Sequence, residues 1–213
     1  MQLSSKAQEV LQALDHDDPK MGDVKKIAAE IKKNHSLALE LWATKAFGAR
    51  LLSLLIMDKM LLTQETIDSL AGDMADHEDD QRDKLSEWLL AHQLMKSKKT
   101  TALIEGWADH PSTVLRRLFW YYQGRLRWMG KVPVDNAASL LQAINQSMAN
   151  EAPDVQWAMN FTAGWIGVHQ PEYRDECIKL GESLGLYKGD PVSRGCTPSY
   201  LPEFIAVEVS KLV

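Results

Sequence analysis

The segment PSTVLRRLFWYYQGRLRWMGK, from Pro111 to Lys131, concentrates arginine and aromatic rings in one helix-length stretch. It carries five basic residues and no acidic one, although the chain has a net charge of −5. Guanidinium groups bind phosphate in a bidentate way, and aromatic rings stack on bases or brace sugars. The segment therefore indicates a nucleic-acid-binding surface. The alternative is a buried repeat helix whose arginines pair with acids on the next helix.

Acidic residues gather in GDMADHEDDQRDKLSE, from Gly72 to Glu87, which has seven acids and two bases. Clustered acids favour a helix N-terminus, because they interact well with the positive end of the helix dipole. We interpret the segment as a solvated helix start. Four of its side chains could ligate a metal, namely Asp76, His77, Asp79 and Asp80. They lack a defined ligand spacing, so we expect no metal and no cofactor.

The chain shows no Gly-rich phosphate loop, nucleophile elbow or Cys/His pair. Cys177 and Cys196 are too few for a disulfide framework and lack zinc-site spacing. The N-terminal MQLSSKAQEV has no apolar signal core. The apolar run from Leu51 to Met57 is too short to span a bilayer. We expect a cytoplasmic protein with reduced thiols and no membrane partner.

Helical periodicity dominates the sequence. In KIAAEIKKNHSLALELW and ARLLSLLIMDKM the apolar residues recur at three- and four-residue spacing. Prolines separate the periodic segments, and Thr63 precedes the polar start of another, as helix N-caps do. We expect about ten to twelve helices of roughly 10–18 residues, and no sheet.

The connections between these helices are short, which favours antiparallel neighbours. Many amphipathic helices with short turns fit a helical solenoid better than a compact bundle. We therefore predict a single all-α repeat domain over residues 1–213. The Gly-, Pro- and Ser-rich stretch 187–202 is expected to be an ordered loop before a last helix from about Glu203 to Leu212.

A helical wheel divides the arginine-rich segment into three faces. The expected core stripe is Leu115, Leu118, Phe119, Tyr122, Leu126 and Met129. A second face holds Arg116, Trp120 and Arg127, and a third holds Arg117, Tyr121, Arg125 and Trp128. The arginines thus share faces with rings.

A later helix, VQWAMNFTAGWIG, also has two faces. Val155, Ala158, Thr162 and Ile166 form the expected core. Trp157, Phe161, Gly164 and Val168 form the other face. The two rings on that face are either exposed in a groove or packed under the C-terminal loop.

Several stretches together resemble the DNA alkylation repair family of HEAT-like helical-repeat proteins, which includes glycosylases that remove alkylated purines. HSLALELWATKAFGARLLSLLIMD, TVLRRLFWYY, VQWAMNFTAGWIG and CTPSYLPEFI occur in the family's order and with similar spacing. The resemblance implies a C-shaped α-α superhelix of the HEAT-like or armadillo type. Its concave face would be basic and carry DNA. It also suggests a monomer.

The resemblance also implies site residues. The family's catalytic Asp falls on Glu87, which would stabilise positive charge on the sugar, and its paired Trp falls on Asp83. The family's Arg falls on Arg117 and its later Trp on Phe161. Three positions depart from the family, because an expected Trp, Arg and Glu are Asp83, Gly164 and Gly48 here.

Two functions follow from these residues. The first is binding of alkylated duplex DNA, with excision of N3- or N7-alkylpurines at Glu87 if the protein is an enzyme. The expected DNA contacts are Arg116, Arg117, Trp120, Arg125, Arg127, Lys96, Lys98, Lys99, Trp157 and Phe161. The second is a non-catalytic scaffold that binds DNA or a protein partner on the solenoid surface.

Overall fold

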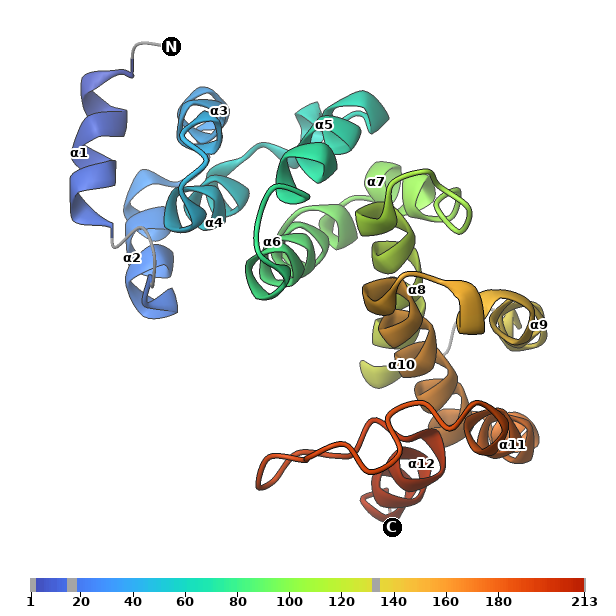
Figure 1. The fold of residues 1–213 in the computed structure, drawn as a ribbon. Coiled ribbons are helices and arrows are strands. Elements are labelled where there is room, and N and C mark those ends of the chain that lie inside the picture. The colour runs from blue at the N-terminus through green and yellow to red at the C-terminus, as the bar shows by residue number, and fades with distance from the viewer. Residues whose placement is uncertain (1–2, 15–18, 132–134, 213) are drawn as a thin grey trace. The chain divides into compact units, whose positions relative to one another are not determined.

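The computed structural model describes residues 3–14, 19–131 and 135–212. These ranges form twelve α-helices, four short 3-10 helices and no strand (Figure 1). The α-helices have between 7 and 17 residues. This confirms the all-α class. No described helix is long and apolar enough to cross a membrane. The chain divides into two compact units, Met1–Gly106 and Trp107–Val213.

Helix starts follow the local sequence signals. Thr63 caps the helix Gln64–Met74, and its hydroxyl accepts a hydrogen bond from the Thr66 N–H at 3.2 Å. A side-chain oxygen on the N-cap residue satisfies one of the N–H groups left free at a helix start. Pro153 is the first residue of its helix, where its missing N–H costs nothing. The predicted Thr63 cap is therefore confirmed.

Unit 1 is built around one buried helix, α4 (Phe47–Ile56), which packs against α2, α3 and α6. Nine of its ten residues are buried, so neighbours cover it on every side. The α-helices of this unit are α1 (Ser5–Ala13), α2 (Met21–Ile31), α3 (His35–Ala43), α4, α5 (Gln64–Met74), α6 (Asp79–His92) and α7 (Lys98–Ile104). The 3-10 helices are η1 (Lys59–Leu61) and η2 (Leu94–Lys96).

Helix α4 carries a buried arginine with several partners. Arg50 is 1% exposed and lies over the Trp42 ring, 4.8 Å from its centre. Its guanidinium donates to the carbonyls of Trp42 at 3.2 Å and Asp73 at 2.6 Å. Asp73 in turn accepts from Trp42 Nε1 at 2.7 Å. Burial lowers the Arg50 pKa, and the carboxylates of Asp73 and Asp76 oppose that shift.

Unit 2 is built around α10 (Pro153–His169), which packs against α8, α9, α11 and α12. Its four predicted core residues, Val155, Ala158, Thr162 and Ile166, are all 0% exposed. The other α-helices are α8 (Thr113–Trp128), α9 (Ala137–Ser147), α11 (Arg174–Leu184) and α12 (Leu201–Ser210). The 3-10 helices are η3 (Met148–Asn150) and η4 (Pro171–Tyr173).

The loop between α11 and α12 extends away from the helices before it returns to α12 (Figure 1). Thr197, near its end, donates its hydroxyl hydrogen to the Glu208 carboxylate. Lys211 Nζ donates to the Thr197 oxygen at 3.0 Å, which ties the end of the loop to α12. Helix α12 begins two residues earlier than predicted, because Pro202 is accommodated in its first turn.

Candidate nucleic-acid interface

One row of side chains on α8 alternates cations and rings. Arg117, Tyr121, Arg125 and Trp128 follow at four-, four- and three-residue intervals, which places them along one side of the helix. The Arg117 guanidinium lies 5.5 Å from the Tyr121 ring centre. The Arg125 guanidinium lies 6.0 Å from the same ring and 5.1 Å from the Trp128 ring. The face predicted from the helical wheel is therefore present as a continuous row.

Two rings of α10 extend this row across the helix pair. Trp157 and Phe161 are stacked with their centres 5.4 Å apart and their planes 15° apart. The Tyr121 ring lies 6.0 Å from Trp157 and 5.3 Å from Phe161. Gly124 allows this approach, because a Cβ there would lie 2.6 Å from a Phe161 ring carbon. We define the α8–α10 interface as the α8 row, namely Arg117, Tyr121, Arg125 and Trp128, together with the two α10 rings, Trp157 and Phe161.

The members of the α8 row differ in burial. Arg117 is 2% exposed, with its guanidinium also 5.4 Å from the Trp157 ring centre, so it joins α8 to α10. Arg125 is half-buried and Trp128 is 50% exposed. The C-terminal end of the row therefore offers a charge and a ring to a ligand. Arginine held against rings loses little freedom on binding phosphate.

Arg116 lies on the second predicted face and has structural partners. Its guanidinium donates to Glu151 at 3.1 Å and to the His110 carbonyl at 2.7 Å. The Arg116–Glu151 pair joins the start of α8 to the residue before the α10 N-cap. For this arginine the structure agrees with the alternative given above, in which arginines of a repeat helix pair with neighbouring acids.

Arg127 and Trp120, from the same predicted face, are buried. Arg127 is 0% exposed and donates to Gln170 at 2.8 Å and Asn136 at 2.7 Å. Burial lowers its pKa to about 10. Trp120 is 3% exposed. Neither side chain can reach DNA in this conformation, so we omit both from the proposed interface. Arg117 is just as buried and belongs to the interface as the residue that positions its rings, while Arg125 and Trp128 are the members of the α8 row that DNA can contact directly.

The core stripe predicted for α8 is confirmed at Leu115, Leu118, Phe119 and Tyr122, which are all buried. Leu126 is half-buried, and Met129 is 45% exposed. The prediction for Met129 was wrong because the helix ends at Trp128, and Met129 is its C-cap.

Glu87 and Asp83 lie one turn apart on α6, in unit 1, and both are half-buried. Trp88 beside them packs on His92, with ring centres 5.1 Å apart, and has Lys25 Nζ 5.8 Å from its ring. The ring next to Glu87 in sequence is thus engaged with other partners.

Lys96, Lys98 and Lys99 are exposed around η2 and the start of α7. The Lys96 carbonyl accepts from Lys59 Nζ at 3.0 Å, which adds a fourth lysine to this part of unit 1.

The acidic segment forms local pairs. His77 Nδ1 is 2.8 Å from Gln81 Oε1, and Asp79 pairs with Arg82 at 2.8 Å. Within the described ranges, no three His, Cys, Asp or Glu side chains are grouped as metal ligands would be.

A hollow of about 160 Å³ adjoins the two α10 rings, and sequence reasoning did not identify it. It is lined by Trp157, Asn160, Phe161, Thr197, Ser199 and Phe204. The available signal was Asn160, a lone amide between apolar residues in AMNFTAGW. Phe204 could not be anticipated, because α12 places it there from more than forty residues away. Its ring lies so close to Gly164 that a Cβ there would be 2.7 Å from it.

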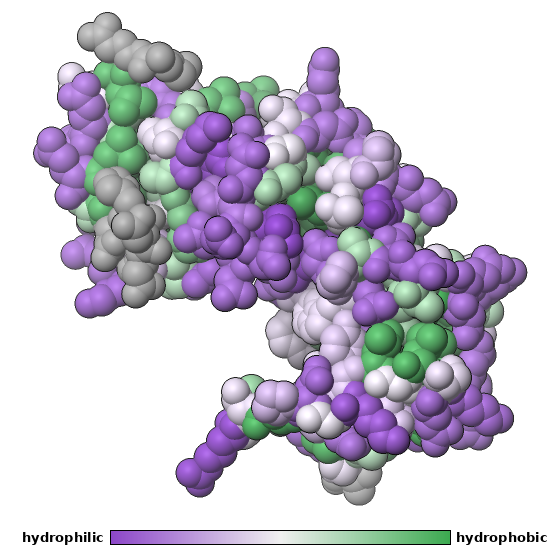
Figure 2. Space-filling model, in the orientation of Figure 1, coloured by the Kyte–Doolittle hydropathy of each residue, from purple (hydrophilic) through white to green (hydrophobic). Residues whose placement is uncertain are grey.

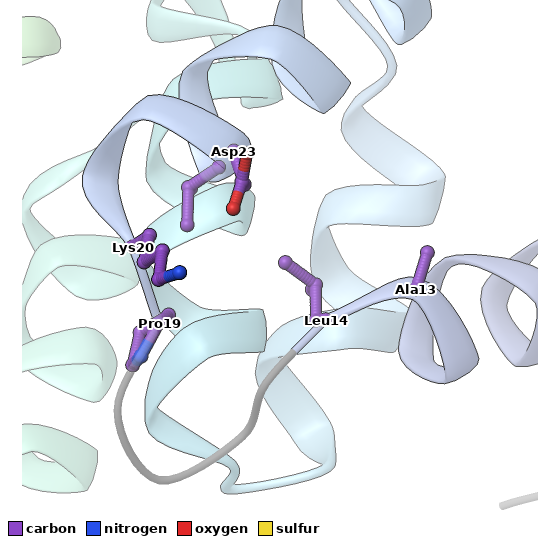
Figure 3. Close-up of a pocket in the computed structure, with 6 residues that line it drawn as sticks. Ala13, Leu14, Pro19, Lys20 and Asp23 are labelled. Atoms are coloured by element: carbon purple, nitrogen blue, oxygen red, sulfur yellow. The ribbon is translucent and has the colours of Figure 1, made fainter.

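A second hollow, of about 220 Å³, lies between the end of α1 and the start of α2 (Figure 3). Its lining offers one ammonium, from Lys20, and one carboxylate, from Asp23, beside Leu14 and Val24. These groups form no arrangement that suggests a chemical role.

The fold and the interface define an all-helical repeat protein with a face of arginines and rings. A family model described as DNA alkylation repair enzyme matches residues 19–177, which is more than half of the chain. The chain belongs to this DNA alkylation repair family.

One solved structure is described as "a new family of proteins related to the HEAT-like repeat DNA glycosylases with affinity for branched DNA structures". It aligns with a TM-score of 0.65 and 18% identity, over 98% of this chain and 88% of that one. The similarity shows that the chain has the HEAT-like repeat fold. A search of curated proteins found no match.

Proposed function

We propose that the protein binds DNA through the α8–α10 interface of unit 2 and does not excise bases. The observation that carries the proposal is the row of Arg117, Tyr121, Arg125 and Trp128, joined to the Trp157–Phe161 stack. Ring-braced guanidinium groups suit phosphates, and rings suit exposed bases. Membership of a DNA repair family supports the same conclusion.

Branched DNA is the substrate that we favour over intact duplex. The similar solved protein is described as having affinity for branched DNA. At a branch point base stacking is interrupted, so the exposed end of a stack can meet a protein ring. Trp128, which is 50% exposed beside the half-buried Arg125, supplies such a ring next to a charge.

Base excision is disfavoured by the residues around Glu87. Asp83 stands where the family pattern has a Trp, and it puts a second carboxylate one turn from Glu87. Like charges at this spacing on a helix repel each other and also repel phosphate. Gly48 and Gly164 also replace two charged residues of the family pattern. We therefore expect the protein to bind DNA without cleaving the glycosidic bond.

Arg125 is the position that tests binding most cleanly, because the buried Arg117 also joins two helices. Arg125→Glu should weaken binding to a four-way junction about tenfold or more. It should also reduce the slope of log affinity against log salt concentration by about 1, because one phosphate contact fewer releases about one counterion fewer. Fluorescence anisotropy at several salt concentrations measures both. Lys179→Glu is the matched control, an exposed lysine on α11 with the same charge change.

Unchanged junction affinity of Arg125→Glu would refute the phosphate role of the α8 row. If the wild-type protein bound neither junction nor duplex, the protein-partner scaffold would replace DNA binding as the function. The lysines of unit 1 remain predicted phosphate contacts. The double substitution Lys98→Glu and Lys99→Glu should weaken binding to DNA of every sequence alike, because phosphate contacts carry no sequence information.

The absence of excision is tested with alkylated duplex DNA. We expect no release of free methylated base from the wild-type protein or from Glu87→Gln. Release by wild type that Glu87→Gln abolishes would show that the protein is a glycosylase with Glu87 as its carboxylate.

A further inference from the structure

The hollow beside Trp157 and Phe161 is walled mainly by rings. The stacked pair from α10 forms one continuous aromatic surface, and Phe204 from α12 adds a third ring. The Phe204 ring is held by an edge contact with Trp165, with centres 5.4 Å apart and planes 89° apart. Flat aromatic surfaces of this kind bind other planar rings by stacking.

The same rings belong to the interface proposed above. Trp157 lies against the Arg117 guanidinium, and Phe161 lies against Tyr121 of the α8 row. The hollow and the cationic row therefore share a wall.

Asn160 supplies an oriented polar atom in the lining. It is 5% exposed, and its Nδ2 donates to the Ser199 carbonyl at 2.8 Å. Because a carbonyl only accepts, this bond fixes which amide atom is nitrogen. The buried Oδ1 accepts no hydrogen bond from any residue in the described ranges. A buried acceptor without a donor is costly, which favours a ligand that carries an N–H. The Oδ1 has almost no accessible surface in this conformation, so the ligand N–H meets it when the Asn160 side chain turns towards the hollow.

The volume sets the size of that ligand. About 160 Å³ is well below the roughly 300–1,000 Å³ of sites for drug-sized molecules, so one small planar ring system fits. Each DNA base is planar and carries an N–H. No charged side chain is among the six lining residues, and three of them are aromatic, which favours a base over a phosphate as the occupant.

We propose that this hollow receives a single unpaired base of bound DNA, stacked on Trp157 and Phe161 and donating an N–H to Asn160 Oδ1. The inference rests on the proposed DNA-binding function and adds the base subsite to it. Such a subsite would provide a way to distinguish branched or gapped DNA, which contains unpaired bases, from intact duplex.

The test compares two three-way junctions that differ at one position. One carries an unpaired adenine at the branch, and the other carries an abasic analogue there. We expect the wild-type protein to bind the adenine junction about tenfold more tightly, in line with the worth of one base stacked on a protein ring. With 2-aminopurine in place of the adenine, its fluorescence should fall on binding as it stacks on the rings.

Two substitutions impair the subsite in different ways. Ser199→Leu adds bulk to the lining and keeps the backbone carbonyl that accepts from Asn160. Asn160→Leu keeps the side-chain volume and removes the acceptor. Ser199→Leu should bind the two junctions equally, at the affinity that the wild type has for the abasic one. Asn160→Leu keeps the stacking rings and should show a smaller preference for the adenine junction than the wild type. Ser193→Leu, exposed in the same loop and outside the lining, is the matched control and should keep the preference.

Folding of each variant is checked through Cys177. This thiol is buried, and burial raises its pKa to about 12, so it stays unreactive while unit 2 is folded. Equal wild-type affinity for the adenine and abasic junctions would refute the base subsite and leave DNA binding in place. A preference that persists undiminished in folded Ser199→Leu and Asn160→Leu would also refute it. Loss of all DNA binding by the wild type would overturn both proposals.

Discussion

Helix α4 of unit 1 and helix α10 of unit 2 are both central and largely buried, and an arginine packs on aromatic side chains at each. The arginine belongs to α4 itself in unit 1 and to the neighbouring α8 in unit 2. In unit 1, Arg50 lies over Trp42, and hydrogen bonds to Trp42 and Asp73 complete the group. Asp73 also accepts from the Trp42 indole, so this set of polar groups satisfies itself. The cluster stabilises its own unit.

In unit 2 the ring contacts of the arginine extend along a second helix. Arg117 lies against Tyr121 and Trp157, and from Trp157 the rings run at four-residue intervals along α10 through Phe161 and Trp165 to His169. A hollow with an unpaired acceptor opens beside them. Arginine and aromatic rings thus occur together in both units, within one polar cluster in unit 1 and along a helix pair that adjoins a hollow in unit 2. In the function that we propose, the second arrangement is the one that binds DNA.

Arg50→Met should have the largest effect, because it removes the partner of buried carbonyls and of Asp73. We expect a loss of roughly 2–5 kcal/mol in the free energy of unfolding, because the carbonyls of Trp42 and Asp73 each lose a charged donor at a cost of roughly 1–3 kcal/mol. Urea denaturation measures it. Lys45→Met is the control, since its ion pair with Asp76 is exposed and should contribute only about 0–1 kcal/mol. Similar losses of stability in the two variants would contradict the view that the buried Arg50 cluster stabilises unit 1 more than the exposed Lys45–Asp76 ion pair does.

Gly124→Val should have the next largest effect, on the rings of unit 2. A Cβ at this position would lie 2.6 Å from Phe161, so the ring must move away from Tyr121. Overpacking of this kind costs roughly 1–3 kcal/mol. Junction affinity should fall with it, because the α8–α10 interface is displaced.

Gly72→Ala on α5 provides the control for Gly124→Val. A Cβ at Gly72 meets nothing within 4 Å, so the substitution should stabilise the protein by roughly 0.5–1 kcal/mol through helix propensity. If Gly124→Val left both stability and junction affinity unchanged, the close contact between α8 and α10 would have no role in holding the rings.

The parts of the structure that the sequence predicted are those that depend on one helix at a time. The spacing of Arg117, Tyr121 and Arg125 predicted a shared face, and the all-helical class followed from apolar periodicity. Both required only local geometry, in which residues three and four apart are neighbours.

The parts that could not be predicted depend on distant partners. Arg127 was assigned to DNA, but its guanidinium bonds to Gln170, which lies 43 residues away in the chain. The hollow required Phe204 and Ser199 to meet Asn160, and nothing in the periodicity of α10 indicates which segment covers it. The helical wheel predicted which polar and aromatic residues share a face. Which of them are buried depends on packing against distant segments, which the wheel does not contain.

His169, at the end of the ring series, should give the smallest effect, which depends on pH. Burial, followed by the charge of Arg127, lowers the His169 pKa below its usual 6.5, so the folded protein holds the ring neutral on Trp165. The unfolded chain binds the proton more readily. Stability should therefore decrease as pH falls below 6.5 towards the folded pKa, and recover as pH rises. His169→Gln removes this dependence, so the advantage of wild type over the variant in urea denaturation should be greater at about pH 7.5 than at about pH 5. An advantage that grew as the pH fell would mean that the folded protein favours the charged ring, contrary to its position beside Arg127.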